Sequence, residues 1–548
     1  MLGSEYNWLL KLTHTAEGTP KVGLEKSSLF TLGIAIFCFL CLALHAEPSA
    51  AEQTPIPASS IVIDVRQLGA IGDGRVHLIG EWIAQGRFSS LRELRRVCPV
   101  IQSADWSVDE AAFELAKTKL PPEGGTIYFP AGRYLAAHRS WTVMKDNVRL
   151  LGDGDEKSIL LTQPEIQDAL VLSPYRHVGW QQSAAQQFPF RADSGQRGSD
   201  NVTLLDPAWT GKFHAGDLVF IRNGACRFDQ DYGEFNEVSA TGANGELRFK
   251  HALSRDYTLD RLNWAGTVAS DFVLPKIHQN VTVATAVGEG NSQPRTGEVV
   301  TVGGQLFEVT GIGNASLRLL NPGRGNVPPG TKIPAGARIA LSRAVIKVTQ
   351  STRNFRAEKL QFVGHRKVLN LSNSYGMEFT DCRFTRKPVV NSDTKGGLTI
   401  DGDGGRDARF IRCTLQAAPP WAMQFARSFG DVTFDSCTFL DANVAFTEFC
   451  FNCAVTNSEF DFHGPAPEAV IIIGKSGGDF RILNNRIRSK NAGFIFDSKT
   501  DIQSQKHRGE GTFVIRSNTV SATGKTQLFR LNSDLHADIE NNSVLTSP

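Results

Sequence analysis

The sequence lacks several features on which whole classes of function depend. It has no run of basic residues and no basic patch interleaved with aromatic residues, and its 58 lysines and arginines nearly balance its 56 aspartates and glutamates. A nucleic-acid partner is therefore not indicated. No G-x-G-x-x-G pattern follows the short Gly72-Asp73-Gly74 segment, so nucleotide binding is not indicated either.

Metal-binding patterns are also missing. Cys450 and Cys453 form a C-x-x-C pair, but no second pair stands at the spacing of a zinc site. Packing inside the fold, or a disulfide in an oxidising compartment, is the expected role of these two cysteines. Asp401, Asp403 and Asp497 are the candidates for binding Ca²⁺, although the spacing of a calcium loop is absent. No cofactor follows from the sequence, and calcium stays an open alternative.

The most apolar segment is too short for an ordinary membrane span. Residues 29–44 (LFTLGIAIFCFLCLAL) form this segment of 16 residues. Lys21 and Lys26 precede it and Ala46 follows, as in a secretory signal peptide that is cleaved after a small residue. We expect residues 1–46 to be a signal peptide, or an anchor if uncleaved, and residues 47–60 to be a linker. The expected location is secreted, periplasmic or at the cell surface.

What the chain does contain is one short phrase, repeated eight times. Its pattern is an apolar residue, two mostly polar residues, a mostly small polar residue or cysteine, one further residue and a second apolar residue. The copies read AEKLQF, FTDCRF, FIRCTL, FDSCTF, VTNSEF, ILNNRI, IRSNTV and IENNSV. The fourth positions are Leu360, Cys382, Cys413, Cys437, Ser458, Asn485, Asn518 and Asn542. Their irregular spacing is typical of solenoid turns that carry loops of variable length.

This repeat predicts an all-β fold, a single-stranded right-handed parallel β-helix. Each strand would pair with its equivalent one coil above and below, at about 4.8 Å, so that equal positions stack into columns. Inward Phe, Ile, Val and Leu would fill the cylinder. The bend at the fourth position favours Asn, which tolerates the left-handed conformation and bonds its stacked counterpart, or Cys, which fits as a small buried residue. The alternative is a β-sandwich, which has no such eight-fold phrase.

Three glycine motifs follow the linker. A predicted helix at residues 107–120, with Ser107 and Glu110 as its capping box, separates the first motif from the second. The motifs are Gly69-Ala70-Ile71-Gly72-Asp73-Gly74, then Gly124-Gly125 with Pro130, Gly132 and Tyr134, and Gly152-Asp153-Gly154. This succession resembles the N-terminal region of the pectate-lyase-like superfamily, which includes rhamnogalacturonase, epimerase-like domains and phage tailspikes. The resemblance implies a parallel β-helix with an N-terminal helical cap and an action on polysaccharides, although residues 75–107 displace the family's usual T-D-D-T segment.

Two insertions are expected within this framework. Residues 201–259 resemble the superfamily's segment in which antiparallel hairpins interrupt the solenoid. Residues 276–341 alternate strands with Gly-Gly, Gly-Asn and Pro-Pro-Gly breaks, which predicts a small barrel or sandwich. Sugar or partner binding and a spacer role are both open for this module. The expected domains are a cap with the first coils and hairpins at 61–275, the inserted module at 276–341 and C-terminal coils at 342–548.

One face of the predicted coils gathers candidate site residues. In the superfamily that the chain resembles, the strands preceding each copy of the phrase line the substrate groove. The outward candidates on this face are Asp401, Asp403, Gln424, Glu448, Lys475, Asp497, Lys499 and Arg530. By the period of two, the residues expected to point inward are Phe425, Ile472, Phe496 and Leu531. Arg427 is a further binding candidate, and Trp421 and Phe462 are candidate platforms for stacking against sugars.

Two chemistries suit such a face. A glycoside hydrolase needs two carboxyl groups about 5 to 10 Å apart, one of them protonated, and the predicted pair is Asp401 or Asp403 with Glu448, two coils away. A polysaccharide lyase needs a cation to neutralise a uronate carboxylate and a base to remove the neighbouring proton. The candidates for those two roles are Lys475, His463 and Arg488.

No complete catalytic motif is present. Polygalacturonase-like hydrolases of the superfamily carry four motifs, of which this chain has only the fragments Asn391-Ser392-Asp393, Asp401-Gly402-Asp403, His463-Gly464 and Arg486-Ile487-Arg488. The paired Asp-Asp is absent, Phe462 replaces the glycine expected before His463, and the D-P-H-E phrase of alginate epimerases is missing. The sequence therefore predicts an exported protein that processes an acidic or complex polysaccharide by hydrolysis or β-elimination. The alternative is a non-catalytic glycan-binding adhesin or tailspike-like surface protein, as a monomer or homotrimer.

Overall fold

In the computed structural model, the described residues lie between Ile61 and Thr546. The residues outside the description are 1–60, 173–189, 193–194, 205, 224–232, 255–256, 258–264, 290–295, 297–298, 303–304, 322–327, 342–343, 350, 388–397, 418–422, 448–449, 464–468, 475–478, 491–492, 499–511, 524–526, 531–535 and 547–548. The predicted signal segment and linker therefore lie outside the described residues. The same holds for Trp421, Glu448, Lys475 and Lys499.

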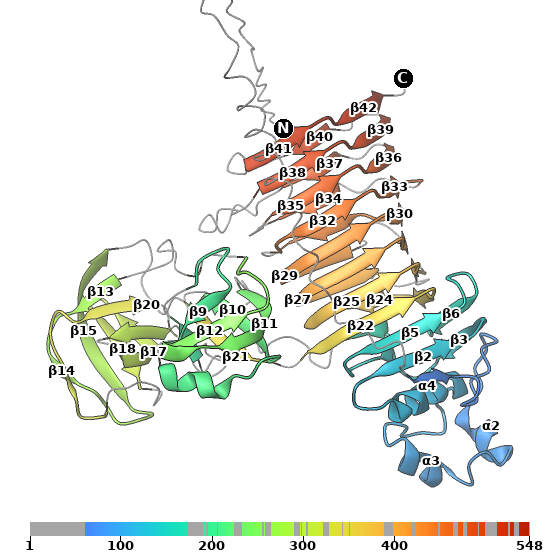
Figure 1. The fold of residues 1–548 in the computed structure, drawn as a ribbon, viewed down its shortest axis with the longest axis horizontal. Coiled ribbons are helices and arrows are strands. Elements are labelled where there is room, and N and C mark those ends of the chain that lie inside the picture. The colour runs from blue at the N-terminus through green and yellow to red at the C-terminus, as the bar shows by residue number, and fades with distance from the viewer. Residues whose placement is uncertain are drawn as a thin grey trace, which may run out of the picture. The chain divides into compact units, whose positions relative to one another are not determined.

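Most of the described chain winds into stacked coils that carry three parallel β-ladders, so the predicted parallel β-helix is confirmed (Figure 1). The first ladder contains β1 (Val62–Asp64), β2 (Gly125–Phe129), β5 (Val148–Gly152), β22 (Thr352–Glu358), β25 (Ser374–Thr380), β27 (Ile400–Ile411), β29 (Met423–Asp435), β32 (Cys453–Thr456), β35 (Phe480–Leu483), β38 (Thr512–Arg516) and β41 (His536–Glu540). Every pairing in this ladder is parallel, as stacking of equivalent strands requires.

The second and third ladders complete the coils. The second contains β4 (Trp141–Thr142), β7 (Asp168–Val171), β24 (Lys367–Asn370), the first parts of β27 and β29, β31 (Val444–Phe446), β34 (Ala469–Ile473), β37 (Phe494–Asp497) and β40 (Gln527–Arg530). The third contains β3 (Gly132–Ala136), β6 (Ser158–Thr162), β23 (Gln361–Gly364), β26 (Arg383–Arg386), β28 (Thr414–Gln416), β30 (Thr438–Leu440), β33 (Glu459–Asp461), β36 (Arg486–Lys490), β39 (Thr519–Thr523) and β42 (Ser543–Thr546). The long strands β27 and β29 run through two ladders, which joins the first and second into one sheet.

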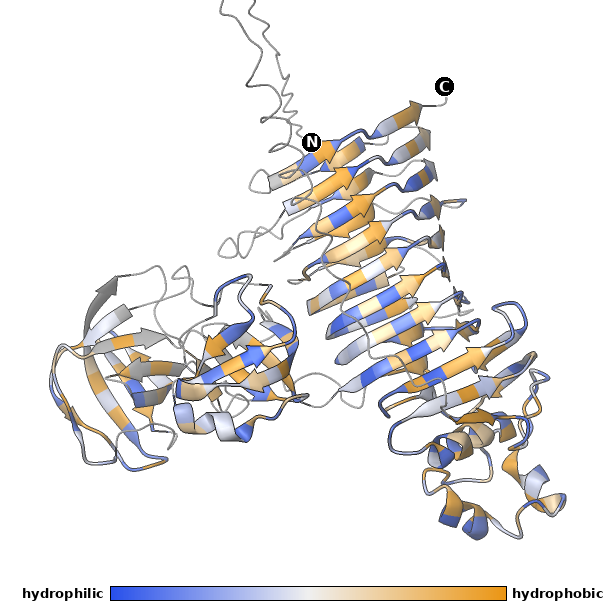
Figure 2. Ribbon diagram, in the orientation of Figure 1, coloured by the Kyte–Doolittle hydropathy of each residue, from blue (hydrophilic) through white to orange (hydrophobic). Residues whose placement is uncertain are grey.

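Inward apolar columns form the core of the coils. Apolar and polar residues alternate along many of these strands, as Figure 2 shows, because successive side chains point to opposite faces. In the third ladder the inward column is Phe362, Phe384, Leu415, Phe439, Phe460 and Ile487, all fully buried. Stacking repeats within the column, since the ring centroids of Phe439 and Phe460 lie 4.1 Å apart with nearly parallel planes. This repeated packing replaces a single globular core.

The fourth positions of the repeated phrase form one column, as the sequence predicts. The backbone N–H of Thr414 donates to the Cys382 carbonyl at 2.9 Å, and that of Thr438 donates to the Cys413 carbonyl at 2.8 Å. Further along, the Ser458 N–H donates to the Asn485 side chain at 2.9 Å. The left-handed residue, however, is the third position and not the fourth, with φ between 51° and 57° at Lys359, Asp381, Arg412, Ser436, Asn457, Asn484, Ser517 and Asn541. Bending and stacking are thus divided between two neighbouring residues.

The cysteines of the described residues are buried and form no disulfide. They are Cys98, Cys382, Cys413, Cys437, Cys450 and Cys453. Burial raises the pKa of the Cys382 thiol to about 12 and that of Cys98 to about 11. Such thiols are protonated and unreactive at neutral pH, so they act here as packing residues.

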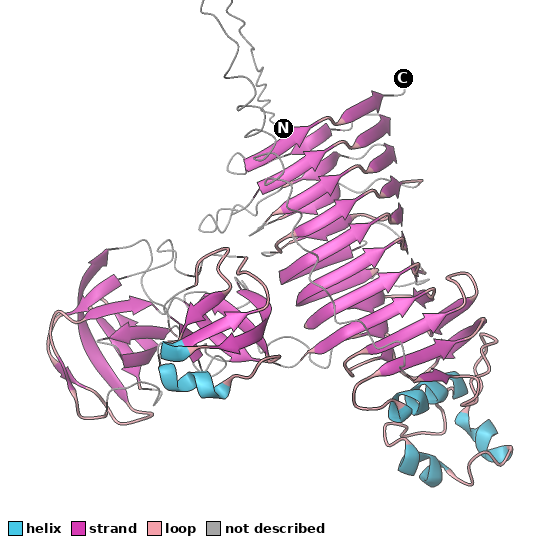
Figure 3. Ribbon diagram, viewed as in Figure 1, coloured by secondary structure: helices cyan, strands magenta, loops and turns pink. Residues whose placement is uncertain are grey.

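The α-helices of the described residues gather at the N-terminal end of the coils (Figure 3). They are α2 (Ile79–Ala84), α3 (Leu91–Val97) and α4 (Val108–Lys119), and α4 shares one apolar cluster with the coils. The Ser107 hydroxyl caps α4 by accepting from the Glu110 N–H at 3.2 Å, but the Glu110 carboxylate accepts from the His138 N–H instead of completing the predicted capping box. Gly124 of the second glycine motif has φ of 100°, and a Cβ there would lie 2.2 Å from the Asn147 carbonyl oxygen. Only glycine fits that contact.

Two antiparallel assemblies lie between β7 and β22 in the chain. A six-stranded sheet contains β8 (Phe190–Ala192), β9 (Asn201–Thr203), β10 (Leu218–Asn223), β11 (Gly233–Thr241), β12 (Glu246–Phe249) and β21 (Ala344–Val348), with 3-10 helices η1 (Pro207–Lys212) and η2 (Ala243–Gly245). A closed barrel contains β13 (Ala265–Val268), β15 (Asn280–Glu289), β16 (Val299–Val302), β17 (Gln305–Gly313), β18 (Ser316–Leu320) and β20 (Arg338–Leu341), beside the pair β14 (Phe272–Val273) and β19 (Lys332–Ile333). Each has its own apolar cluster. None of the helices in the described part of the chain has the length and apolar character that a bilayer crossing requires.

Candidate functional site

The second ladder carries an outward polar column. Its register aligns, one coil after another, Asn370, Asp401, Gln424, Ala445, Ile472, Asp497 and Arg530. The adjacent inward column is Leu369, Ile400, Met423, Val444, Ile471 and Phe496, all buried. The structure therefore brings Asp401, Gln424, Asp497 and Arg530 to one face, which is the arrangement that the sequence predicts. Ile472 was expected to point inward, but it lies in the outward column.

Asp401 and Asp403 follow each other on the exposed side of β27, and each contacts a cation from a neighbouring coil. The Asp401 carboxylate accepts a hydrogen bond from Lys367 of β24, on the preceding coil. The Asp403 carboxylate accepts from Nη1 of Arg427 of β29, on the following coil, at 2.6 Å. All four side chains are at most a quarter exposed. Both carboxylates are thus held in partly buried ion pairs between coils.

An unusual backbone turn places Arg427. This residue and Ser428 are consecutive non-glycine residues in the left-handed region, with φ of 54° and 64°. Such residues are uncommon and persist where the surroundings hold them. Arg427 is held by its bond to Asp403, and the fully buried Ser428 hydroxyl accepts from the Gly233 N–H of β11 at 3.2 Å. The turn therefore joins the polar column to the six-stranded sheet.

The remaining predicted residues of this column also have protein partners. Nε2 of Gln424 lies 3.4 Å from the Thr447 hydroxyl on the next coil. Asp497, which is almost fully buried, accepts two hydrogen bonds from Arg530, one of them from Nε at 2.8 Å. Asp497 stands four strands from Asp401, which is about 19 Å at ladder spacing and outside the range of a glycosidase pair. Glu448, the carboxylate predicted to complete such a pair, lies outside the described residues.

His463 and Arg488 belong to a different wall from the polar column. Arg488 is on β36 of the third ladder, where its guanidinium contacts Glu459 at 2.5 Å and Asp461 at 2.8 Å. His463 follows β33, and its ring nitrogens lie 3.6 Å from Asp461 and 4.0 Å from Asp441. The hydrogen bond from Arg488 lowers the pKa of the Asp461 carboxyl. His463 and Arg488, the predicted base and cation of a lyase, therefore both contact Asp461, but Arg488 is already paired with two carboxylates.

Ion pairs between neighbouring coils recur along the whole solenoid. Examples are Arg149 with Glu358, Arg383 with Asp155, Arg412 with Asp381, and Arg516 with Asp538. A charged pair on an outward column is therefore ordinary in this fold and does not by itself mark a catalytic centre. Lys367, which the sequence reasoning missed, could have been found only by assuming that each outward carboxylate has a cation one coil away.

The predicted calcium ligands do not form one site. Asp401, Asp403 and Asp497 each contact a cationic side chain, and Asp497 is four strands from Asp401. Within the part of the chain that the structure describes, no group of three or more His, Cys, Asp or Glu side chains is placed to hold a metal ion. The residues present therefore do not fit a Ca²⁺ ion.

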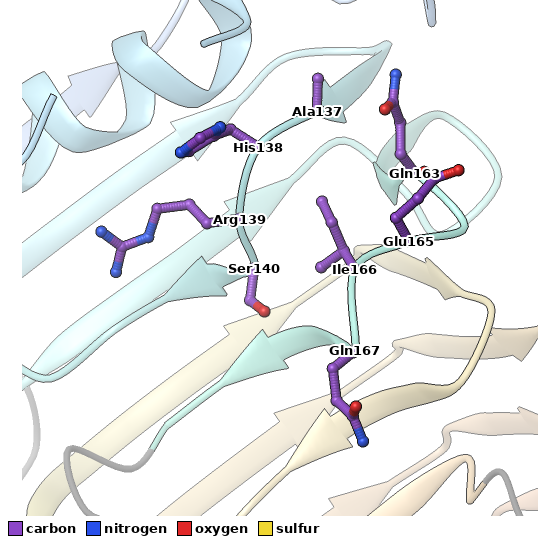
Figure 4. A pocket seen from close by; sticks show the side chains of 8 residues that line it. All are labelled: Ala137, His138, Arg139, Ser140, Gln163, Glu165, Ile166 and Gln167. Carbon is purple, nitrogen blue, oxygen red and sulfur yellow. The ribbon is translucent and has the colours of Figure 1, made fainter. Parts of the chain in front are cut away.

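A polar pocket of about 430 Å³ lies at the N-terminal coils, and its lining includes none of the predicted site residues. Its lining residues, seen in Figure 4, are Ala137, His138, Arg139, Ser140, Gln163, Glu165, Ile166 and Gln167. His138 and Arg139 extend away from Gln163 and Glu165, and both contact the Trp106 ring, at 5.2 Å and 5.6 Å from its centroid. Because these polar groups do not converge, the pocket has less of the character of a binding site than the polar column.

Comparison with known proteins identifies neither a family nor an activity. No protein-family model matches the sequence, and no curated protein matches it. Similar solved structures include the tailspike protein gp49 from Pseudomonas phage LKA1, at 14% identity and a TM-score of 0.46, over 89% of this chain and 78% of that one. The tailspike gp61 of Pseudomonas phage phi297 has 14% identity and a TM-score of 0.42, over 88% and 74%. The Gp54 tailspike of Acinetobacter baumannii bacteriophage AP22, in complex with a capsular saccharide, has 10% identity and a TM-score of 0.36, over 85% and 69%. At these values the likeness carries no argument, and the parallel β-helix is established by the pairing of the strands.

Proposed function

We propose that the protein is an exported polysaccharide-binding protein of the pectate-lyase-like superfamily, and that the polar column of the second ladder contacts the glycan. The ligand class comes from the resemblance of the opening glycine motifs to that superfamily. The binding residues would be Asp401 and Gln424 of this column, with Asp403 and Arg427 beside them on the same two coils. Stacked coils suit a chain-like ligand because their side chains repeat at about 4.8 Å along the wall.

The ion pairs of Asp401 and Asp403 are the observation that favours binding over hydrolysis. A hydrolase must keep one carboxyl protonated so that it can donate to the leaving oxygen. Asp401 and Asp403 instead each accept a hydrogen bond from a cationic side chain of a neighbouring coil, Lys367 and Arg427, which engages the carboxyl oxygens that such a donor would need. Ordered, ion-paired side chains instead offer fixed acceptors and donors to sugar hydroxyl groups.

The proposal is tested with a panel of uronate-containing and neutral polysaccharides. We expect the full chain to be retained on at least one immobilised glycan, while reducing-end assays and the absorbance of unsaturated products stay at background. A rise in reducing ends alone would show hydrolysis, and absorbance of unsaturated sugars would show a lyase. Failure to bind any glycan would contradict the proposal. Light scattering on the same sample distinguishes a monomer from a homotrimer.

Substitutions at the Asp403–Arg427 pair should weaken that binding. We expect Asp403→Asn and Arg427→Gln each to raise the dissociation constant about tenfold, because each removes one charge-assisted hydrogen bond. Asp538→Asn is the matched control, since Asp538 pairs with Arg516 on the first ladder in the same manner. Isothermal titration calorimetry measures the effect. Equal affinities for all four proteins would place the glycan elsewhere on the surface.

A further inference from the structure

One buried arginine fastens the six-stranded sheet to the coils. Arg406 of β27 is 2% exposed, and its guanidinium contacts the carboxylates of Glu234 at 3.6 Å and Asp431 at 2.5 Å. Glu234 belongs to β11 of the inserted sheet, whereas Asp431 belongs to β29 of the coils. The guanidinium also donates to the Phe235 carbonyl at 3.0 Å and lies 5.5 Å from the centre of the Phe451 ring. Arg406 of one coil therefore contacts both the insert and the neighbouring coil.

Further hydrogen bonds and an apolar cluster surround Arg406. Within the insert, the fully buried Glu234 accepts hydrogen bonds from the backbone N–H of Ser254 at 2.8 Å and from its hydroxyl. Burial alone would lower the pKa of Arg406, but the carboxylates of Asp431 and Glu234 outweigh it and raise that pKa. Beside these charges, an apolar cluster joins Leu218, Phe220 and Phe235 of the insert to Tyr375 of β25. The interface thus combines a buried charge cluster with apolar packing.

His251 of the insert brings a titratable group to the same contact. Its Nε2 lies 2.9 Å from the Tyr375 hydroxyl, and the ring is half-buried. Burial and then the positive charge of Arg406 lower the pKa of His251 to about 4, with smaller contributions from Lys250 and Arg409 in the same direction. Asp431 acts in the opposite direction. The docked insert therefore favours the neutral form of the His251 imidazole.

We propose that Arg406, Glu234, Asp431, His251 and Tyr375 form an acid-sensitive latch that holds the insert on the coils at neutral pH and releases it in mild acid. In a released insert His251 would meet water, where its pKa returns to about 6.5. Docking is then at full strength above pH 6.5 and weakens as the pH falls from 6.5 toward 4, because only the released form gains the proton. At pH 5 the docking equilibrium should be about 30-fold weaker than at pH 7.5.

The latch also bears on the proposed glycan site. The insert contacts Ser428, and the neighbouring Arg427 holds Asp403, so release should loosen the turn that carries Arg427. This consequence rests on the proposed function, whereas the latch itself does not. Glycan affinity should accordingly fall in acid together with docking.

Hydrogen exchange on the full chain tests the latch directly. Exchange at pH 7.5 and pH 5.0 is compared after correction for the intrinsic pH dependence of the exchange rate. We expect the amide of Gly233, which donates to the Ser428 hydroxyl across this contact, to lose protection at pH 5.0, while peptides of β32 and β35 keep theirs. His251→Gln should remove this acid opening, because the amide can still bond the Tyr375 hydroxyl but does not titrate. His214→Gln, at an exposed histidine of the same insert, is the matched control and should open like the unmodified protein.

The outcomes separate the two proposals. Equal protection of the Gly233 amide at both pH values, or unchanged acid opening in His251→Gln, would overturn the latch. Arg406→Met should open the insert at both pH values, and unchanged protection would also overturn it. If that variant does not fold, Glu234→Gln removes one charge of the cluster with little change in shape and should show the same opening. Acid opening without glycan binding at any pH would support the latch and contradict the proposed function.

Discussion

Replacing Phe410 by alanine is expected to lower the free energy of unfolding by about 3–5 kcal/mol. Phe410 of β27 is fully buried, and its ring stacks on Phe379 and Phe434 of the coils on either side, with centroids 5.0 Å and 4.6 Å away. Edge contacts with Phe384 and Phe425 surround the same ring. Parallel backbone ladders hold the neighbouring coils apart, so the wall cannot collapse into the cavity. The loss of unfolding free energy should therefore lie at the upper end of the range for a large-to-small substitution in a core.

Urea unfolding followed by circular dichroism measures this effect. The matched control is Arg412→Ala on the same coil, which removes an exposed ion pair with Asp381 and should leave the midpoint close to that of the unmodified protein. Hydrogen exchange adds a local test, since each coil of a solenoid contacts only its neighbours. Protection should fall first in β25, β27 and β29. Loss of protection spread evenly over all coils, or a midpoint equal to that of the control, would contradict the role given to the stacked rings.

The repeated phrase determined the coils because two physical constraints act on the same few residues. An inward apolar position and a stacked fourth position recur together, and only a fold in which equal positions lie above one another satisfies both. The observed contacts between Cys382, Cys413 and their neighbouring coils confirm this interpretation. The sequence could not tell which residue adopts the left-handed conformation, since Asn484 and Asn485 are both asparagines. The structure assigns the bend to Asn484 and the ladder to Asn485.

Outside the repeated phrase it was harder to predict which side chains of a strand point inward and which point outward. Ile472 lies within the apolar run Ala469–Ile473, where alternation gives no signal, and its register with Asp497 shows that it points outward. The continuous strands β27 and β29 were not predicted either. Each passes through a bend inside the strand, at Gly404–Gly405 in one and at Arg427–Ser428 in the other. Arg and Ser are not typical bend residues, so this turn left no mark in the sequence.

For the candidate site, the sequence predicts the face of the sheet on which each residue lies, but not the side chain that it contacts. The period of two placed Asp401, Gln424 and Asp497 together, because all three precede copies of the phrase. Which cation contacts each carboxylate depends on the register between neighbouring coils. That register cannot be derived from the sequence, because the loops between the strands vary in length. The same is true of Arg406, whose contact with Glu234 joins residues 172 positions apart. A charged residue in an alternating segment would be taken as solvated, yet Arg406 is only 2% exposed.

Replacing Asn518 by leucine is expected to lower the free energy of unfolding by about 3 kcal/mol. Asn518 is fully buried, and its Oδ1 accepts from both the backbone N–H and the side chain of Asn485, each at 3.0 Å. Its Nδ2 donates to the Ile482 carbonyl at 2.9 Å and to the Asn542 side chain at 2.8 Å. Leucine has a similar volume, so the change leaves no large cavity. It leaves the Asn485 N–H and the Ile482 carbonyl without the hydrogen bonds that Asn518 makes to them, and each loss costs about 1–3 kcal/mol of stability.

The neighbouring residue supplies the matched control for this prediction. Ser517 is exposed and has φ of 57°, a conformation that glycine adopts without the clash of a Cβ. Ser517→Gly should therefore leave the unfolding midpoint unchanged or raise it slightly, although the two positions are adjacent in the chain. Thermal unfolding of both variants measures the difference. If Asn518→Leu matches the unmodified protein, the buried amide ladder contributes nothing to stability, and apolar columns alone hold the coils in register.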